Sequence, residues 1–314
     1  MKTLIQNART LGKYLGSSET LVSACLLIED DKIKKIDSVI DAEDESVDKI
    51  INAKNNILLP GLIDPQVHFR EPGLEYKEDI KSGSQAANKG GFTSVISMPN
   101  TMPTADNPEV VKFMWDKQSE LSLCRVYPTG AVTMGLKGES LTNFEELKNA
   151  GAIALTDDGK GIQSDELFKE AMINAAKLDL AILDHSEDES LSAGGAIHKG
   201  EHAKKYSVKG IDSKSESVHV KRGCDLSGET GCHYHVLHIS TKESIEHVKE
   251  AKKKGFKVTA EVSPHHLVLC DEDIPEREEG QLHPNWKMNP PLRSSEDRKA
   301  CVAALADGTI DAIA

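Results

Sequence analysis

Aspartate and histidine side chains recur in this sequence directly after short apolar runs. Asp158, His185 and His238 each follow such a run. Carboxylate and neutral imidazole are the ligands of hydrolytic zinc sites, in which an open coordination position holds a water that ionises near neutral pH. Taken singly, Asp-Asp-Gly is an ordinary turn and a lone histidine is more often a hydrogen-bonded wall residue. Three such residues after three successive runs favour a metal-dependent hydrolase.

The apolar runs that carry these residues alternate with helical stretches from Pro60 onward. Helices are predicted over 164–178 and 241–253, the second after a Ser/Thr cap. Continuous apolar strands with helices between them indicate a buried parallel sheet. Eight such units predict a (β/α)8 barrel, whereas an open doubly wound sheet is disfavoured because no Gly-x-Gly-x-x-Gly follows the first strand. The predicted strands are 61–63, 92–98, 125–129, 152–156, 181–184, 235–239, 257–262 and 310–314.

Residues 1–59 have a different pattern, which predicts a small β unit with strands over 21–28, 32–36 and 57–59. Residues 60–314 would then form the barrel. The sequence stops on the eighth predicted strand, although a barrel needs a helix after it. We therefore expect a chain that is incomplete at its C-terminus, whose β unit would be completed by a later segment.

Composition restricts the partners and the location. The formal net charge is -13, which argues against non-specific binding to nucleic acid. Six scattered cysteines without a Cys-x-x-Cys pair indicate a reducing compartment. The sequence shows neither a signal peptide nor a membrane span. A cytoplasmic enzyme with a small-molecule substrate is predicted, with a homodimer as the candidate oligomeric state.

Several longer motifs resemble those of the dihydroorotases, a family of the amidohydrolase superfamily. Matches occur in the family's order from about residue 58 to the last residue, which is far more specific than any one motif. The matching segments are Leu58 to Asp64 with His68-Phe69-Arg70-Glu71-Pro72-Gly73, Met98-Pro99-Asn100-Thr101, Asp157-Asp158-Gly159, 184–188, 235–241, 263–267 and Lys287-Met288-Asn289-Pro290-Pro291-Leu292-Arg293.

The resemblance implies an activity and a set of site residues. The family interconverts L-dihydroorotate and N-carbamoyl-L-aspartate in pyrimidine synthesis. By resemblance, Asp158 bridges two metals, His185 and His238 bind one of them, and His68 binds the other. The residues that would hold the substrate's carboxylate and ring amide are Arg70, Asn100 and Asn289. A planar guanidinium suits a carboxylate.

Two features depart from the family pattern. The first histidine of its His-x-His pair is here Gln66, whose carbonyl is a weak ligand for zinc. We expect one firmly held zinc at Asp158, His185 and His238, and a second metal that is weak or absent. The family's catalytic aspartate would lie just beyond Ala314, so the 314-residue chain is expected to be inactive.

Two alternatives stay open at this point. Hydantoinases and allantoinases cut similar cyclic amides, but they lack an arginine at the position of Arg70 and often use a carboxylated lysine where this chain has Asp158. A non-catalytic homologue that supports aspartate transcarbamoylase is the other alternative.

Six further polar positions are interpreted as lying outside the predicted metal and substrate contacts. His235 is interpreted as structural. His265 and His266 are interpreted as partners of the site or as wall residues, with the structural role preferred, and Asp157 as a turn residue or a partner of the site. Glu216 and Arg222 are predicted on a helix before the sixth strand, with solvated charges.

Overall fold

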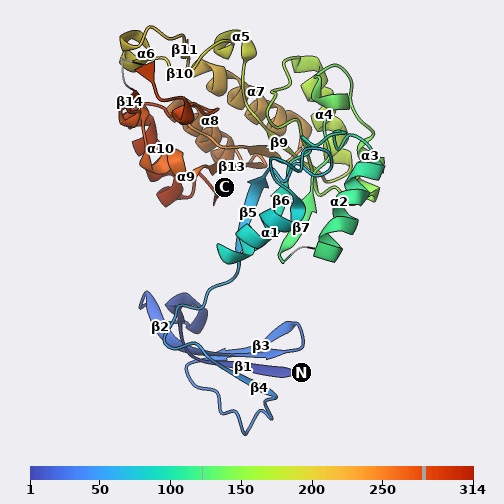
Figure 1. The fold of residues 1–314 in the computed structure, drawn as a ribbon, viewed down its shortest axis with the longest axis vertical. Coiled ribbons are helices and arrows are strands. Elements are labelled where there is room, and N and C mark those ends of the chain that lie inside the picture. The colour runs from blue at the N-terminus through green and yellow to red at the C-terminus, as the bar shows by residue number, and fades with distance from the viewer. Residues whose placement is uncertain (122, 278–280) are drawn as a thin grey trace. The chain divides into compact units, whose positions relative to one another are not determined.

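The computed structural model describes residues 1–121, 123–277 and 281–314, and the chain divides into the units Met1–Gly61 and Leu62–Ala314 (Figure 1). The first unit is a four-stranded sheet of order β3-β2-β1-β4. Neighbouring strands are antiparallel except for the parallel pair β1 and β4. Its strands are β1 Lys2–Leu11, β2 Leu21–Glu29, β3 Lys32–Asp37 and β4 Lys49–Asn52, with a 3-10 turn at Gly12–Leu15.

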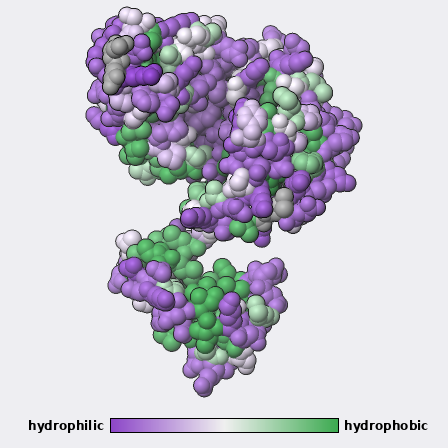
Figure 2. Space-filling view, in the orientation of Figure 1, coloured by the Kyte–Doolittle hydropathy of each residue, from purple (hydrophilic) through white to green (hydrophobic). Residues whose placement is uncertain are grey.

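The strand predictions for this unit were partly wrong. The predicted strands over 21–28 and 32–36 match β2 and β3, whereas β1 and β4 were not predicted. The segment 57–59 is not a strand, because only Ile57 pairs, in a single bridge with Arg9. Its side chains at Ile57 and Leu59 are about half exposed. Figure 2 shows apolar surface on this unit, which also has an apolar cavity of about 250 Å³ lined by Leu26, Ile33, Ile36, Leu58 and neighbours.

The eight strands predicted for the second unit are all present, and the six pairs of them that are joined by strand ladders are parallel. A parallel bridge between Gly130 and Leu155 links β7 to β8. The last strand, β16, lies next to the first, β5. The strands therefore follow one another in sequence order around a (β/α)8 barrel. They are β5 Leu62–Val67, β6 Phe92–Ser97, β7 Arg125–Pro128, β8 Ala154–Thr156, β9 Ala181–Asp184, β12 Tyr234–Val236, β13 Val258–Val262 and β16 Ala312–Ile313.

Helices surround these strands, as Figure 1 shows. The predicted helices over 164–178 and 241–253 are α4 and α8, and their N-caps Ser164 and Thr241 accept hydrogen bonds from the first turn. The longer helices are α1 Ile80–Lys89, α2 Pro108–Leu121, α3 Phe144–Asn149, α4 Asp165–Lys177, α7 Lys214–Thr230, α8 Lys242–Lys253 and α10 Ser295–Asp307. Within the described ranges, no helix has both the length and the apolar character needed to cross a membrane.

Short elements lie in the connections of the barrel. Between β9 and α7 the chain forms α5 Glu189–Ser192, β10 Ile197–His198, α6 Glu201–Lys205 and β11 Gly210–Ile211. After β13 it forms α9 Pro264–Val268, β14 Glu276–Arg277 and β15 Gln281–Leu282. Further 3-10 turns are Met134–Leu136, Asp271–Asp273 and Pro284–Trp286.

Side chains alternate between the inside of the barrel and the layer under the helices. Leu155 and Ile182 pack with Phe168 and Met172 of α4 in the main apolar core, whereas Ala154 and Leu183 pack with Met98 in a smaller inner cluster. Helix α7 lies very close to β12: a Cβ atom at Gly223 would be 2.1 Å from the ring of Tyr234. This close packing fixes α7 against the strand that leads to His238.

Candidate metal centre

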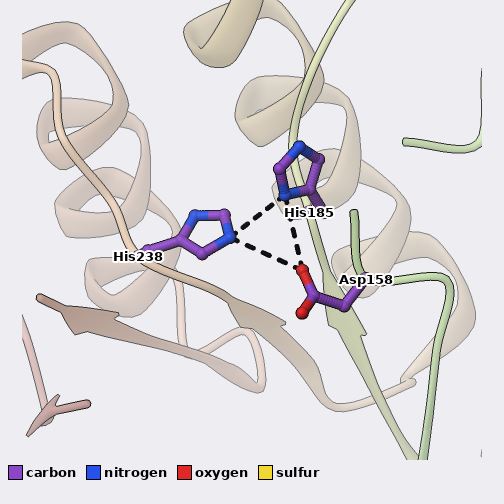
Figure 3. Close-up of side chains that lie close together, drawn as sticks. All are labelled: Asp158, His185 and His238. Carbon is purple, nitrogen blue, oxygen red and sulfur yellow. Dashed lines mark hydrogen bonds and ion pairs between the residues drawn. The ribbon is translucent and has the colours of Figure 1, made fainter. Parts of the chain in front are cut away.

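Three buried side chains meet where three neighbouring parallel strands end (Figure 3). Asp158 follows β8, His185 follows β9 and His238 follows β12. The Nδ1 atom of His185 is 3.1 Å from the Nε2 atom of His238. The Oδ1 atom of Asp158 is 3.5 Å from the first of these atoms and 3.6 Å from the second. The structure thus brings together the three residues that the sequence predicted to hold a metal most firmly.

The spacing of these three atoms fits a small divalent cation. Ligand atoms at roughly 2.0–2.2 Å from a tetrahedral ion are about 3.3–3.6 Å apart. The three observed separations lie close to that range. Two imidazole nitrogens and a carboxylate oxygen also form a donor set typical of hydrolytic metal sites. The residues therefore form a candidate metal-binding triad, which we call the Asp158 triad.

The electrostatics of the triad favour a cation. Burial alone would lower the pKa of His185, but its hydrogen bonds with Asp158 and Glu187 outweigh burial and raise this pKa to about 10. Burial alone would raise the pKa of Asp158, yet hydrogen bonds with His185 and His238 hold it well below its usual value. Without a metal the site therefore keeps a proton on His185, and a metal ion would have to displace that proton.

Glu187 orients His185, and sequence reasoning gave it no role. Its Oε2 atom is 2.9 Å from the Nε2 atom of His185, so the ring turns Nδ1 toward the triad. The same carboxylate oxygen accepts a 2.8 Å hydrogen bond from the side-chain amide of Asn289. Burial would raise the pKa of Glu187, but hydrogen bonds with His185, Ser192 and Asn289 lower it to about 2. The sequence feature that could have indicated this role is the carboxyl group two residues after His185.

His68 and Gln66 approach the other oxygen of Asp158. The Nε2 atom of His68 is 3.1 Å from Oδ2. The side-chain amide of Gln66 donates to the same oxygen at 3.1 Å. A metal ligand must present a lone pair, whereas Gln66 presents an N–H group. Gln66 therefore donates a hydrogen bond at the position where the family pattern has a metal-binding imidazole. His68 faces a different oxygen from the one shared by His185 and His238.

The three predicted substrate residues lie around the triad. The Nδ1 atom of His68 is 3.1 Å from the amide group of Asn100. Arg70, whose φ is 56°, donates from Nη1 to the backbone carbonyl of Asn100 at 3.2 Å. Asn289 contacts His185 and Glu187 on the opposite flank. Each of the three residues thus touches either a predicted metal ligand or a residue that touches one.

Asp157 and the histidines read as structural have partners outside the triad. Asp157 accepts hydrogen bonds from the backbone N–H groups of Val132 and Thr133, and burial raises its pKa to about 6. His235 hydrogen-bonds Thr259 and Glu261.

His265 and His266 lie against each other, with ring centroids 4.3 Å apart. The Nε2 atom of His266 is 3.3 Å from the carbonyl oxygens of both Pro290 and Pro291, so this ring holds the segment that carries Asn289.

The prediction of solvated charges at Glu216 and Arg222 was wrong. The Glu216 side chain is buried and receives hydrogen bonds from the loop after His238. Arg222 is also largely buried, and it donates to Asp165 and to the backbone carbonyl of Ile162. Their partners lie far away in the sequence, so the local helical pattern gave no sign of burial.

Comparison with known proteins gives the family. Residues 55–244 match the model of the family described as dihydro-orotase-like. The chain is 53% identical over 270 residues to the dihydroorotase of Bacillus caldolyticus and 52% identical over 275 residues to that of Geobacillus kaustophilus. These matches cover 86% and 88% of this chain but only 62% of each relative. The dihydroorotase of Halalkalibacterium halodurans is 47% identical to this chain over all 314 residues, and the match covers 71% of that relative.

Solved structures with the same fold support the architecture. The L-hydantoinase (dihydropyrimidinase) of Arthrobacter aurescens matches 99% of this chain with a TM-score of 0.81, at 24% identity and over 68% of its own length. A D-hydantoinase matches the whole chain with a TM-score of 0.76, at 21% identity and over 68% of its own length. Likeness at this level of identity concerns the fold alone. On the strength of the family match and the closer relatives, the chain belongs to the dihydroorotase-like family.

Proposed function

We propose that this chain carries the metal centre and substrate pocket of a zinc-dependent hydrolase that interconverts L-dihydroorotate and N-carbamoyl-L-aspartate in pyrimidine synthesis. The observation that carries the proposal is the Asp158 triad with Arg70 at its edge, on a chain about half identical to dihydroorotases. Zinc is the ion proposed because carboxylate and imidazole at tetrahedral spacing suit it. When bound, it would polarise the ring amide and activate water.

The chain's own residues would bind and orient the substrate. Arg70 presents a planar guanidinium that can pair with the ring carboxylate. Asn100 and Asn289 approach the centre from opposite flanks and would hold the ring amide through their own amide groups. Glu187 would keep both His185 and Asn289 in place, so metal and substrate positions depend on one carboxylate.

The number of metal ions is part of the proposal. One zinc would bind at Asp158, His185 and His238. A second position beside His68 would be weak, because Gln66 directs an N–H group at the Oδ2 atom of Asp158, the oxygen on the side of that second position. A homodimeric state and a cytoplasmic location stay predictions.

Binding and turnover test the proposal in two steps. Calorimetric titration of zinc-loaded residues 1–314 should detect dihydroorotate and carbamoyl aspartate, but hydantoin and allantoin far more weakly. Turnover should be measured with this chain and with a hybrid in which the part of the Halalkalibacterium halodurans relative beyond its match follows Ala314. We expect the hybrid to turn over dihydroorotate.

The other outcomes favour the alternatives. Preference of the hybrid for hydantoin or allantoin would replace the proposal with another cyclic amidase. Absence of both turnover and ligand binding would favour a non-catalytic homologue.

A further inference from the structure

Glu216 of α7 holds the loop that carries His238. The residue is only 3% exposed. The Oε1 atom accepts hydrogen bonds from the backbone N–H groups of Ser240 at 3.1 Å and Thr241 at 3.0 Å, and from the Thr241 hydroxyl at 3.1 Å. The Oε2 atom accepts from the Ser240 hydroxyl. His238 lies just before this loop with a φ of 36°, which a residue with a side chain rarely adopts. One buried carboxylate thus fixes the backbone next to one predicted metal ligand.

The same turn of α7 also holds the loop that carries His185. The backbone carbonyl of Ser215 accepts a 2.7 Å hydrogen bond from the N–H group of Asp188, three residues after His185. Ser215 and Glu216 are adjacent, and both are buried. Two neighbouring residues of one helix therefore set the relative positions of the two loops, and with them the gap between His185 and His238.

Arg293 connects this arrangement to the segment that carries Asn289. Its guanidinium lies 3.6 Å from the Oε2 atom of Glu216 and donates from Nε to the Ser240 hydroxyl at 3.0 Å. A further hydrogen bond runs to the carbonyl of Ile211 at 3.3 Å. Arg293 is also 3% exposed. It lies four residues after Asn289, so the Glu216–Arg293 pair joins the His238 loop to the predicted substrate segment.

A role in stability alone explains this pair poorly. Burying two charges costs desolvation free energy, and replacing a buried ion pair by apolar residues often leaves stability unchanged or raises it. What an apolar pair cannot supply is the set of directed hydrogen bonds to Ser240 and Thr241. Partners that orient metal ligands commonly change metal affinity when they are removed. The contacts of Glu216 therefore matter for where His238 lies.

We propose that Glu216, supported by Arg293, is a positioning residue that sets the separation of His185 and His238 and thereby the affinity and geometry of the metal centre. This inference rests on the metal centre of the proposed function, but it does not depend on which cyclic amide is the substrate.

Cobalt(II) binding tests the inference without any substrate. The visible absorption bands of cobalt(II) report ligand geometry, and competition with a chelator gives the affinity. The variants are Glu216→Gln and the paired Glu216→Met/Arg293→Met, which removes both charges together. Ser227→Ala is the matched control, because Ser227 is a buried residue of α7 that donates to the carbonyl of Cys232 instead of to a histidine loop.

We expect both Glu216 variants to bind cobalt(II) about 10- to 100-fold more weakly and with shifted bands, as is typical when an outer partner of a ligand is lost. Ser227→Ala should lower the thermal midpoint yet keep wild-type affinity and bands. The paired variant keeps the test valid if Glu216→Gln does not fold.

Two results would overturn the inference. One is a folded paired variant that has wild-type cobalt(II) bands and a cobalt(II) affinity within about twofold of wild type. A change that small is well below the loss of affinity expected when an outer partner is removed. The other is wild-type protein without cobalt(II) bands, since there would then be no centre to position. If cobalt binding weakens as expected while dihydroorotate proves not to be a substrate, the proposed function fails and this inference stands.

Discussion

The side-chain nitrogen of Gln66 lies 3.1 Å from the Oδ2 atom of Asp158, on the carboxylate oxygen that His68 also approaches at 3.1 Å. The other oxygen, Oδ1, faces His185 and His238. One carboxylate therefore separates two different environments. On one side two imidazoles face it, and on the other side one imidazole and one amide N–H do.

Replacing Gln66 by histidine should create a second metal position. Gln66→His would put two imidazoles beside Oδ2, which suits zinc far better than an amide does. We expect the metal content of dialysed protein to rise from about one to about two zinc ions per chain. Elemental analysis measures this, with Gln66→Asn as the control that keeps an amide. Two tightly bound ions in the wild-type chain would contradict the prediction.

Removing one histidine of the triad should abolish tight metal binding. His238→Asn leaves two of the three ligands, and we expect zinc affinity to fall by more than about 100-fold, beyond the cost of losing an outer partner. His235→Asn is the matched control, because His235 lies three residues earlier and hydrogen-bonds Thr259 and Glu261. A chelator competition assay compares the two variants. Equal losses in both would show that the effect comes from the strand and not from the triad.

Substitution of Arg70 should affect only substrates that carry a carboxylate. Arg70→Gln removes a charge and its planar donors, and hydrogen bonds to charged groups are worth about 1.5–3 kcal/mol. In the hybrid protein described above, KM for dihydroorotate should rise about 10- to 100-fold, whereas slow turnover of hydantoin should change little. Arg70→Lys should fall in between, since lysine keeps the charge without the fork. A similar loss with both substrates would contradict a carboxylate-specific role.

Acid should destabilise the barrel through His266. Burial and, to a smaller extent, the neighbouring His265 together lower the pKa of this imidazole to about 3, whereas an unfolded histidine titrates near 6.5. Between these values only the unfolded chain takes up the proton. The contribution of His266 is therefore fully present above pH 6.5 and is lost progressively as the pH falls toward 3.

The comparison with a variant isolates this contribution. Between pH 7 and pH 5, the free energy of unfolding should fall by about 2 kcal/mol more in the wild type than in His266→Gln. Urea unfolding in the presence of a chelator measures the difference. His247→Gln, on the outer helix α8, is the histidine control. An equal pH dependence in wild type and His266→Gln would show that the ring is not held neutral.

Much of the barrel was predictable because buried parallel strands leave continuous apolar runs in the sequence. β1 was missed because Gln6, Asn7 and Arg9 interrupt its apolar residues, and β4 because all four of its residues are exposed. The segment 57–59 was predicted as a strand on apolarity alone, but only Ile57 pairs. Hydrogen-bond partners, which sequence patterns do not show, decide such short edge segments.

The triad was predictable for a related reason. Parallel strands end at one edge of a barrel, so polar residues after neighbouring strands must converge there. The positions of Glu187 and Glu216 were not predictable in the same way. Glu216 is buried because Arg293 and the loop after His238 meet it, and these partners come from segments well separated in the chain. Only the folded chain brings such groups together.

The order of the strands around the barrel also ties metal occupancy to folding. His185 and His238 are 53 residues apart in the sequence, and Asp158 comes from yet another strand. An unfolded chain would have to close long loops to gather the same three ligands, and that costs conformational entropy. A ligand that binds only the folded form stabilises it in proportion to its free concentration and affinity. Metal release during a denaturant titration would therefore report, from inside the barrel, the moment at which β8, β9 and β12 separate.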